Sequence, residues 1–186
     1  RNSERLFRKK IARLIYPEAR ELIAAHQAKG HSVAIISSAT PYQVMPAARD
    51  LNIDRVFCTG LEVANGSFTG AVVKPTCFGE GKVDAAQTLA RDTGADLSQS
   101  FFYSDSVDDI QLLEYVGRPV TLNPRKRLRQ ITKENNWPTT TFDSRGRISV
   151  NRFLRSVAAT GSLVGSVAAA LPLYALTGSK RDSLNF

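Results

Sequence analysis

Apolar runs of strand length alternate with amphipathic stretches of helix length along most of the chain. The predicted strands are "VAII" (33–36), "DRVFCT" (54–59), "SFFYS" (100–104) and "PVTLN" (119–123). The predicted helices cover residues 17–29, 43–51, 82–93, 109–116 and 125–135. Because the strands are mostly apolar runs, both faces of their sheet are expected to be covered by helices. The pattern therefore predicts an α/β fold, with a Rossmann-like parallel sheet and helices on both faces.

One stretch alternates instead of forming a continuous apolar run. In "LEVANGSFTGAVV" (61–73), apolar and polar residues alternate on either side of Asn65 and Gly66. An Asn-Gly pair in such a place is a strong signal for a two-residue hairpin turn. We therefore expect an antiparallel hairpin between the second predicted strand and the third predicted helix.

The last part of the chain differs in composition. Residues 157–177, from Val157 to Thr177, are 21 residues without a charge, and two basic residues lie close on each side. Such a length can just span a bilayer, although the segment is rich in Ala, Gly and Ser. Two interpretations stay open: contact with a membrane, or a helical hairpin that is buried or packed against a partner.

The net charge of +8 is unevenly distributed. Residues 118–155 contain ten Lys and Arg against two acidic residues, whereas residues 16–117 contain seven basic and thirteen acidic residues. An anionic membrane surface is one partner for the basic part, and a solvated face is the other interpretation. No nucleic-acid motif or aromatic ladder accompanies the basic residues, so we expect no nucleic-acid partner.

The composition indicates a globular domain in a reducing compartment. Hydrophobic residues make up 42% of the 186 residues, which is enough for one domain with a core. Cys58 and Cys77 are the two cysteines, and they form neither a disulfide framework nor a zinc-ligand spacing. The basic first residues, "RNSERLFRKKIAR", lack the apolar centre of a signal peptide. We expect a cytoplasmic protein, at the inner face of the cell membrane if residues 157–177 contact lipid.

Polar residues follow several of the predicted strands. Ser37, Thr59 and Asp105 each come at the end of a strand, so a parallel sheet would bring them to one edge, where ligands bind in such folds. Hydroxyls and backbone N–H groups at Ser37 and Ser38 are suited to a phosphate. The alternative is that these serines form an ordinary turn or helix cap.

Two further motifs have charged side chains near strand ends. In "GEGK", Lys82 opens a helix, where a cation is unfavourable unless it faces an anion or solvent. In "YSDSVDD", Asp105, Asp108 and Asp109 lie within five residues, and such like charges repel unless a cation or water separates them. Carboxylate oxygens suit Mg²⁺, and we expect one of Asp108 and Asp109 to cap the following helix.

These motifs resemble a known family. The order of an apolar strand ending in Ser, a Gly-flanked Lys and "YSDSxxD" is similar to motifs II, III and IV of the haloacid dehalogenase superfamily of phosphatases, in particular its phosphoserine-phosphatase-like branch. More narrowly, "ISSATPYQV", "YSDSVDDIQLLEYVGRPVTLNP" and "NNWPT" resemble actinobacterial hydrolases of this branch, which often have a lysophosphatidate-type acyltransferase domain downstream. The resemblance covers about residues 17–143.

The resemblance implies a role for each motif residue. Ser37 would hydrogen-bond a phosphoryl oxygen, with Ser38 beside it, and Lys82 would neutralise the phosphate and an aspartyl-phosphate. Asp105 would ligate Mg²⁺ directly, and Asp109 would support the metal through water or hydrogen bonds. Asp108 would contact the substrate. Phosphoserine phosphatases usually have Asn at that place, which argues against a simple transfer of phosphoserine specificity.

One family motif is absent from the sequence. The family's nucleophile lies in "DxDxT" on the first, central strand, and the 186 residues contain no such motif. Residues 1–16 resemble the last helix of the family's cap, residues 17–145 its α/β core, and residues 146–186 a basic linker with the apolar segment. We therefore expect an N-terminally truncated chain with a gap in the middle of its sheet, which is inactive by itself.

Three interpretations of the function follow. The first is a Mg²⁺-dependent phosphomonoester hydrolase that acts through an aspartyl-phosphate on a small phosphorylated metabolite or a lipid precursor. The second is a non-catalytic, phosphatase-like domain that anchors or regulates a membrane phospholipid acyltransferase. The third is a receiver domain, which is disfavoured because Ser37 and Lys82 precede Asp105 here, whereas receivers have the acidic residues first.

Overall fold

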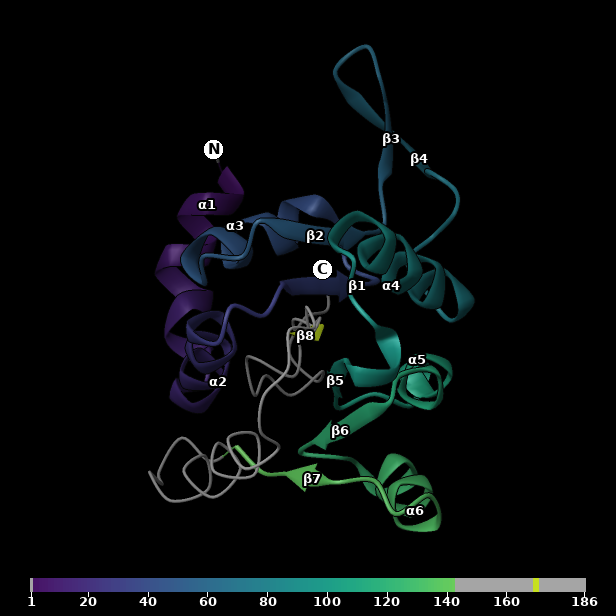
Figure 1. The fold of residues 1–186 in the computed structure, drawn as a ribbon. Helices are drawn as coiled ribbons and strands as arrows, with labels where there is room; N and C mark the ends of the chain where they lie inside the picture. Colours follow the sequence, from purple (N-terminus) through teal and green to yellow (C-terminus); the bar gives the residue numbers. More distant parts are fainter. Residues whose placement is uncertain (1, 143–168, 171–186) are drawn as a thin grey trace.

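A parallel sheet forms the centre of the computed structural model, which describes residues 2–142 and 169–170 (Figure 1). Its strands are β1 (Val33–Ser37), β2 (Arg55–Cys58), β5 (Phe101–Ser104), β6 (Arg118–Leu122), β7 (Thr139–Thr140) and β8 (Ala169–Ala170). Within these residues the strand order is β2-β1-β8-β5-β6-β7, and each neighbouring pair is parallel. The carboxyl ends of the strands therefore lie at one edge of the sheet.

Helices cover both faces of this sheet. They are α1 (Asn2–Leu6), α2 (Pro17–Ala28), α3 (Pro41–Asp50), α4 (Glu80–Thr93), α5 (Ile110–Tyr115) and α6 (Lys126–Glu134). Short turns complete them, namely the π-helical η1 (Phe7–Ile11) and the 3-10 helices η2 (Ala12–Leu14), η3 (Leu97–Gln99) and η4 (Val107–Asp109). Helices α1 to α3 lie on one side of the sheet, and α4 to α6 on the other (Figure 1). The predicted Rossmann-like α/β fold is confirmed.

Neighbouring strand residues pack into two separate cores. Ile35 and Tyr103 belong to the core under α2 and α3, whereas Ile36 and Phe102 belong to the core under α4 to α6. This division follows from the alternation of side chains along a strand. It also explains why β1 is an apolar run: all five of its residues are buried.

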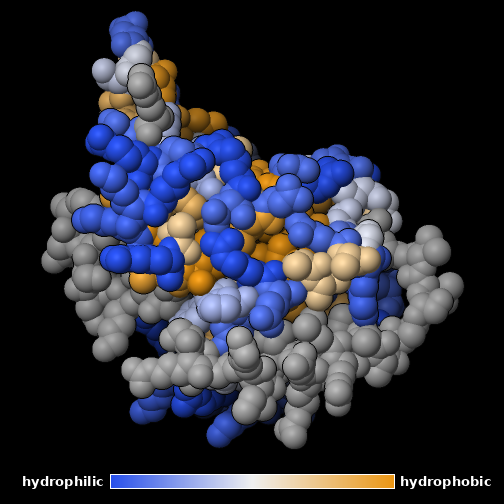
Figure 2. Space-filling model, turned by 90° about the vertical axis from the view of Figure 1, so that its left-hand side faces the viewer, coloured by the Kyte–Doolittle hydropathy of each residue, from blue (hydrophilic) through white to orange (hydrophobic). Residues whose placement is uncertain are grey.

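The predicted hairpin is present and stands away from the sheet (Figure 1). Strands β3 (Leu61–Ala64) and β4 (Ser67–Val72) pair antiparallel, and Asn65 and Gly66 both have positive φ, as a two-residue hairpin turn requires. A hydrogen bond of 2.9 Å from the Val73 N–H to the Gly60 carbonyl closes its base. Apolar surface runs along this projection (Figure 2), and it includes the exposed side chains of Val63, Phe68 and Val72.

The middle of the sheet is only partly filled by the described residues. Ala169 pairs with Val33, and Ala170 pairs with Ala34 on one side and Phe102 on the other. Within the described chain, the carboxyl-terminal part of β1, which includes Ser37, has no strand partner on the β5 side. Among the described residues, Ser37 therefore lies where no strand pairs with β1 on its β5 side.

The structure changes some sequence-based expectations. The short β7 was not predicted, because two residues give no periodicity. The predicted helix 109–116 begins with the 3-10 turn η4 and becomes α-helical at Ile110. The prediction for residues 157–177 falls outside the described residues except for Ala169–Ala170, which form β8. No helix in residues 2–142 has the length and hydropathy that a bilayer crossing needs.

Candidate active site

Ser37 is the last residue of β1 and lies inside the edge of the sheet. It is buried, whereas Ser38 beside it is exposed. The Ser37 hydroxyl accepts a hydrogen bond of 3.2 Å from the Ala39 N–H. That bond turns the chain toward α3, so the interpretation of Ser37 as a turn residue is correct. It also leaves the hydroxyl proton of Ser37 for another acceptor.

Lys82 is buried and does not face solvent. Its residue is 4% exposed, and its ammonium forms an ion pair with the Asp109 carboxylate. The solvent-facing alternative for this lysine is therefore wrong. Gly81 helps to place it, because a Cβ at position 81 would lie 1.9 Å from the Thr76 carbonyl oxygen. Only glycine allows the loop and the first turn of α4 to approach this closely.

Asp109 is the meeting point of a buried polar network. One carboxylate oxygen, Oδ1, accepts from the Lys82 ammonium. The other, Oδ2, accepts a hydrogen bond of 2.6 Å from the Ser104 hydroxyl. Ser104 accepts in turn from the Ser106 N–H at 3.0 Å. Asp109 thus has a hydrogen-bond partner on each oxygen, and both Asp109 and Ser104 are buried.

The other two carboxylates of the motif lie closer to solvent. Asp105 follows β5 directly and is half-buried, while Asp108 is exposed. The expectation that Asp108 or Asp109 caps the next helix is wrong, because Ser106 takes this role. Its hydroxyl accepts from the Asp108 N–H at 3.2 Å, and Asp109 makes no side-chain cap bond. A serine hydroxyl caps a helix as well as a carboxylate does.

Cys77 lies beside these residues and was not predicted from the sequence to belong to the site. Burial raises the pKa of its thiol to about 11, against smaller opposing effects of the Lys82 charge and of a hydrogen bond from the Ser37 backbone. The Cys77 N–H donates to the Thr59 hydroxyl at 3.1 Å. The thiol is therefore a neutral, packed group between Ser37 and Lys82 at neutral pH. Its position five residues before Lys82, in "CFGEGK", is the sequence signal that could have indicated it.

The carboxylates fit magnesium by type but form an incomplete ligand set. Asp105 offers hard oxygen ligands at the edge of the sheet, as Mg²⁺ prefers. Both Asp109 oxygens have protein partners, so Asp109 fits the indirect supporting role better than a direct one. The described residues contain no group of three or more His, Cys, Asp and Glu arranged to hold a metal. Further ligands would have to come from water, backbone or other residues.

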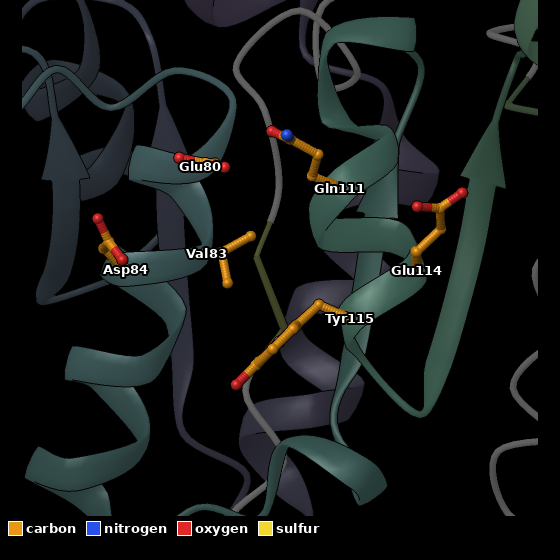
Figure 3. Close-up of a pocket in the computed structure, with 6 residues that line it drawn as sticks. All are labelled: Glu80, Val83, Asp84, Gln111, Glu114 and Tyr115. Carbon is orange, nitrogen blue, oxygen red and sulfur yellow. The ribbon is translucent and has the colours of Figure 1, made fainter.

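A hollow of about 480 Å³ lies between α4 and α5, and none of Ser37, Lys82 and Asp109 lines it. Glu80, Val83 and Asp84 of α4 and Gln111, Glu114 and Tyr115 of α5 line it, and Val83 and Tyr115 point toward each other between the two helices (Figure 3). Its three carboxylates would repel a phosphate, so the hollow is unsuitable as a phosphate site. The candidate active site is the network around Ser37, Lys82 and Asp109 instead.

Comparison with known proteins assigns the chain to a family. The family model described as haloacid dehalogenase-like hydrolase matches residues 2–114. The chain belongs to this family. The match includes the strands that end in Ser37 and Ser104, and it includes Lys82 and all three motif carboxylates. The family resemblance predicted from the sequence is therefore confirmed.

Several relatives within the family are named phosphatases. A probable phosphatase of Mycobacterium tuberculosis is 36% identical over 71% of this chain and 46% of its own length. A phosphoserine phosphatase of the same organism is 35% identical over 86% of this chain and 53% of its own length. The chain thus spans about half the length of these relatives. A solved structure of a Bordetella pertussis protein of unknown function has a TM-score of 0.69 and 30% identity, over 76% of this chain and 64% of that one.

Proposed function

We propose that these residues form the core of a Mg²⁺-dependent phosphomonoester hydrolase that acts through an aspartyl-phosphate. The main support is the buried ammonium of Lys82, which lies with Asp109 near the end of β1. A charge buried this deeply is costly, and a phosphate beside it would offset part of that cost. Because one relative is named a phosphoserine phosphatase, small phosphorylated metabolites are the proposed substrates.

The chain's own residues would bind and orient the phosphate. Lys82 would neutralise the phosphoryl oxygens, and Ser37 would donate its hydroxyl proton to one of them. The exposed Ser38 and Asp108 would contact the rest of the substrate. Asp109 would hold the Lys82 ammonium in place through their ion pair. In phosphoryl transfer, such positioning and charge neutralisation provide most of the catalysis.

Two contributions lie outside this buried network. Asp105 would hold Mg²⁺, with Asp109 supporting it indirectly, and the ion would supply further positive charge to the phosphate oxygens. The nucleophilic aspartate would enter on a strand between β1 and β5, where only Ala169–Ala170 pair among the described residues. Such a strand would bring a carboxylate to the same edge as Ser37 and Lys82.

The proposal is tested by assaying the natural full-length protein with phosphoserine and with p-nitrophenyl phosphate. We expect turnover that requires Mg²⁺ and that falls about 10²-fold or more in Lys82→Met. Lys133→Met, on the exposed face of α6, is the matched control and should keep full turnover. The 186-residue chain alone should be inactive on both substrates.

Two outcomes would contradict the proposal. Equal turnover by the 186-residue chain and the full-length protein would mean that the nucleophile lies within these 186 residues. No Mg²⁺-dependent turnover by the folded full-length protein on either substrate, or on a wider panel of phosphomonoesters, would favour the non-catalytic, phosphatase-like domain instead.

A further inference from the structure

We propose that Ser104 is a positioning residue, which orients the Asp109 carboxylate and thereby fixes the Lys82 ammonium at the phosphate site. Ser104 is fully buried at the end of β5, where it is in register with Thr121 of β6. Its hydroxyl donates to Asp109 Oδ2 at 2.6 Å, and Asp109 Oδ1 accepts from Lys82. The role rests on the function proposed above for Lys82.

The direction of the Ser104 hydroxyl is determined by its neighbours. A serine hydroxyl has one proton to donate, and its oxygen here already accepts from the Ser106 N–H at 3.0 Å. That contact orients the hydroxyl oxygen, so the remaining proton is directed at Asp109. Since the strand and the Ser106 turn hold both contacts, the donor reaches Asp109 from a fixed position.

The Asp109 carboxylate needs such a contact because rotation about its last side-chain bond is only weakly restricted. With Oδ2 bonded to Ser104, the second oxygen can face only one direction, and Lys82 lies there. Without the hydroxyl, Oδ2 would be a buried, unsatisfied carboxylate oxygen. The carboxylate would then rotate toward another donor, and the ammonium would move with it. A displacement of about 1 Å at a phosphoryl clamp is enough to lower the rate strongly.

Ser100 provides a matched control on the same segment of chain. It is also a buried serine, and its hydroxyl donates to the Asp96 carbonyl at 2.7 Å. It immediately precedes β5, at the end of the strand opposite Ser104. Ser100→Ala therefore removes the same buried hydroxyl group and one hydrogen bond, without contact to Asp109 or Lys82.

The first measurement follows the Lys82 ammonium directly and needs no activity. In the full-length protein with ¹⁵N-labelled lysines, the Lys82 ammonium signal is assigned by its loss in Lys82→Met. We expect Ser104→Ala to shift or broaden this signal and Ser100→Ala to leave it unchanged. An unchanged Lys82 signal in folded Ser104→Ala would overturn the proposal, as would an equal change in Ser100→Ala.

The second measurement uses turnover. We expect Ser104→Ala to lower kcat about tenfold or more, with a smaller change in KM, and Ser100→Ala to keep both. If Ser104→Ala does not fold, the isosteric pair Ser104→Thr and Ser104→Val decides, because only the first retains a hydroxyl. Loss of the Lys82 signal in the valine variant alone would support the proposal, and identical spectra would overturn it. If the wild-type protein hydrolyses no phosphomonoester, the proposed function fails, while the Lys82 signal still tests the role of Ser104.

Discussion

The Lys82 ammonium and the Asp109 carboxylate form an ion pair between the first turn of α4 and the turn that follows β5. Their side chains are 5% and 0% exposed, so water screens neither charge. Removing two charges from water can cost more than their mutual attraction in the interior returns, so a buried pair is weak evidence for stability as such. The presence of this buried ion pair has a functional explanation if the Lys82 ammonium binds an anionic ligand.

Breaking this pair from one side should destabilise the fold. Lys82→Met leaves the Asp109 carboxylate buried without its cation, and we expect the free energy of unfolding to fall by about 3–5 kcal/mol. The double variant Lys82→Met with Asp109→Asn should recover part of this loss, because no charge stays buried. Urea unfolding of the chain measures both. Arg20→Met, which breaks an ion pair with side chains 39% and 33% exposed, should cost less than about 1 kcal/mol.

Replacing Asp105 should weaken magnesium binding selectively. Asp105→Asn removes a charged ligand at the edge of the sheet, and we expect a clearly higher Kd for Mg²⁺ in calorimetric titration of the full-length protein. Asp108→Asn is the control: this side chain is exposed and is proposed to contact substrate, so KM should change while the Mg²⁺ affinity stays the same. Equal metal affinity in wild-type protein and Asp105→Asn would exclude Asp105 as a ligand.

A methyl group at position 81 should disrupt both stability and the placement of Lys82. Gly81→Ala places a Cβ 1.9 Å from the Thr76 carbonyl, so the loop before α4 must move, at a cost of roughly 3 kcal/mol. Turnover should fall as well, since Lys82 is the next residue. Gly94→Ala has no atom within 4 Å of its Cβ and only the strain of a φ of 69°, about 1–2 kcal/mol. It should lower the unfolding midpoint but leave turnover intact.

His26 should make the stability of the fold depend on pH. Burial lowers the pKa of His26 from 6.5 to about 4, with smaller effects of His31 and Lys29. Between pH 6.5 and 4 the unfolded chain binds a proton that the folded chain does not, so stability falls as the pH is lowered through this range. The loss should be on the order of 3 kcal/mol, and no loss from this group is expected above about pH 7.

Urea unfolding at several pH values tests this dependence. His26→Gln should flatten the curve between pH 6.5 and 4. His31→Gln is the companion variant, because burial also lowers the pKa of His31 and adds to the slope in the same range. A wild-type slope that persists in both variants would assign the dependence to other groups.

The sequence predicted the local features of the site well. Ser37 could be placed at a strand end because four apolar residues precede the Ser-Ser pair, and Lys82 at a helix start because Gly79 and Gly81 come just before it. These inferences use neighbours in the chain. The hairpin could be predicted in the same way, because the Asn65-Gly66 pair determines its turn.

The polar network could not be predicted in the same way. Lys82 and Asp109 are 27 residues apart, and their contact depends on how α4 and the end of β5 pack. The sequence pattern made Asp109 a metal support or a helix cap, but it gave no sign that Ser104 and Lys82 each bond one of its oxygens. Ser106 rather than a carboxylate caps the turn because both residue types are suited to that role. Competition between equivalent local partners is decided by tertiary packing.

The β3–β4 hairpin can change in length without changing the parallel sheet. Its strands pair with each other, its ends meet at the hydrogen bond between Gly60 and Val73, and one ring contact, between Phe68 and Tyr42, joins it to α3. The sheet therefore does not depend on how long this excursion is. Evolution can lengthen, shorten or exchange the segment between residues 60 and 73 as a module, while the edge with Ser37 and Lys82 stays the same.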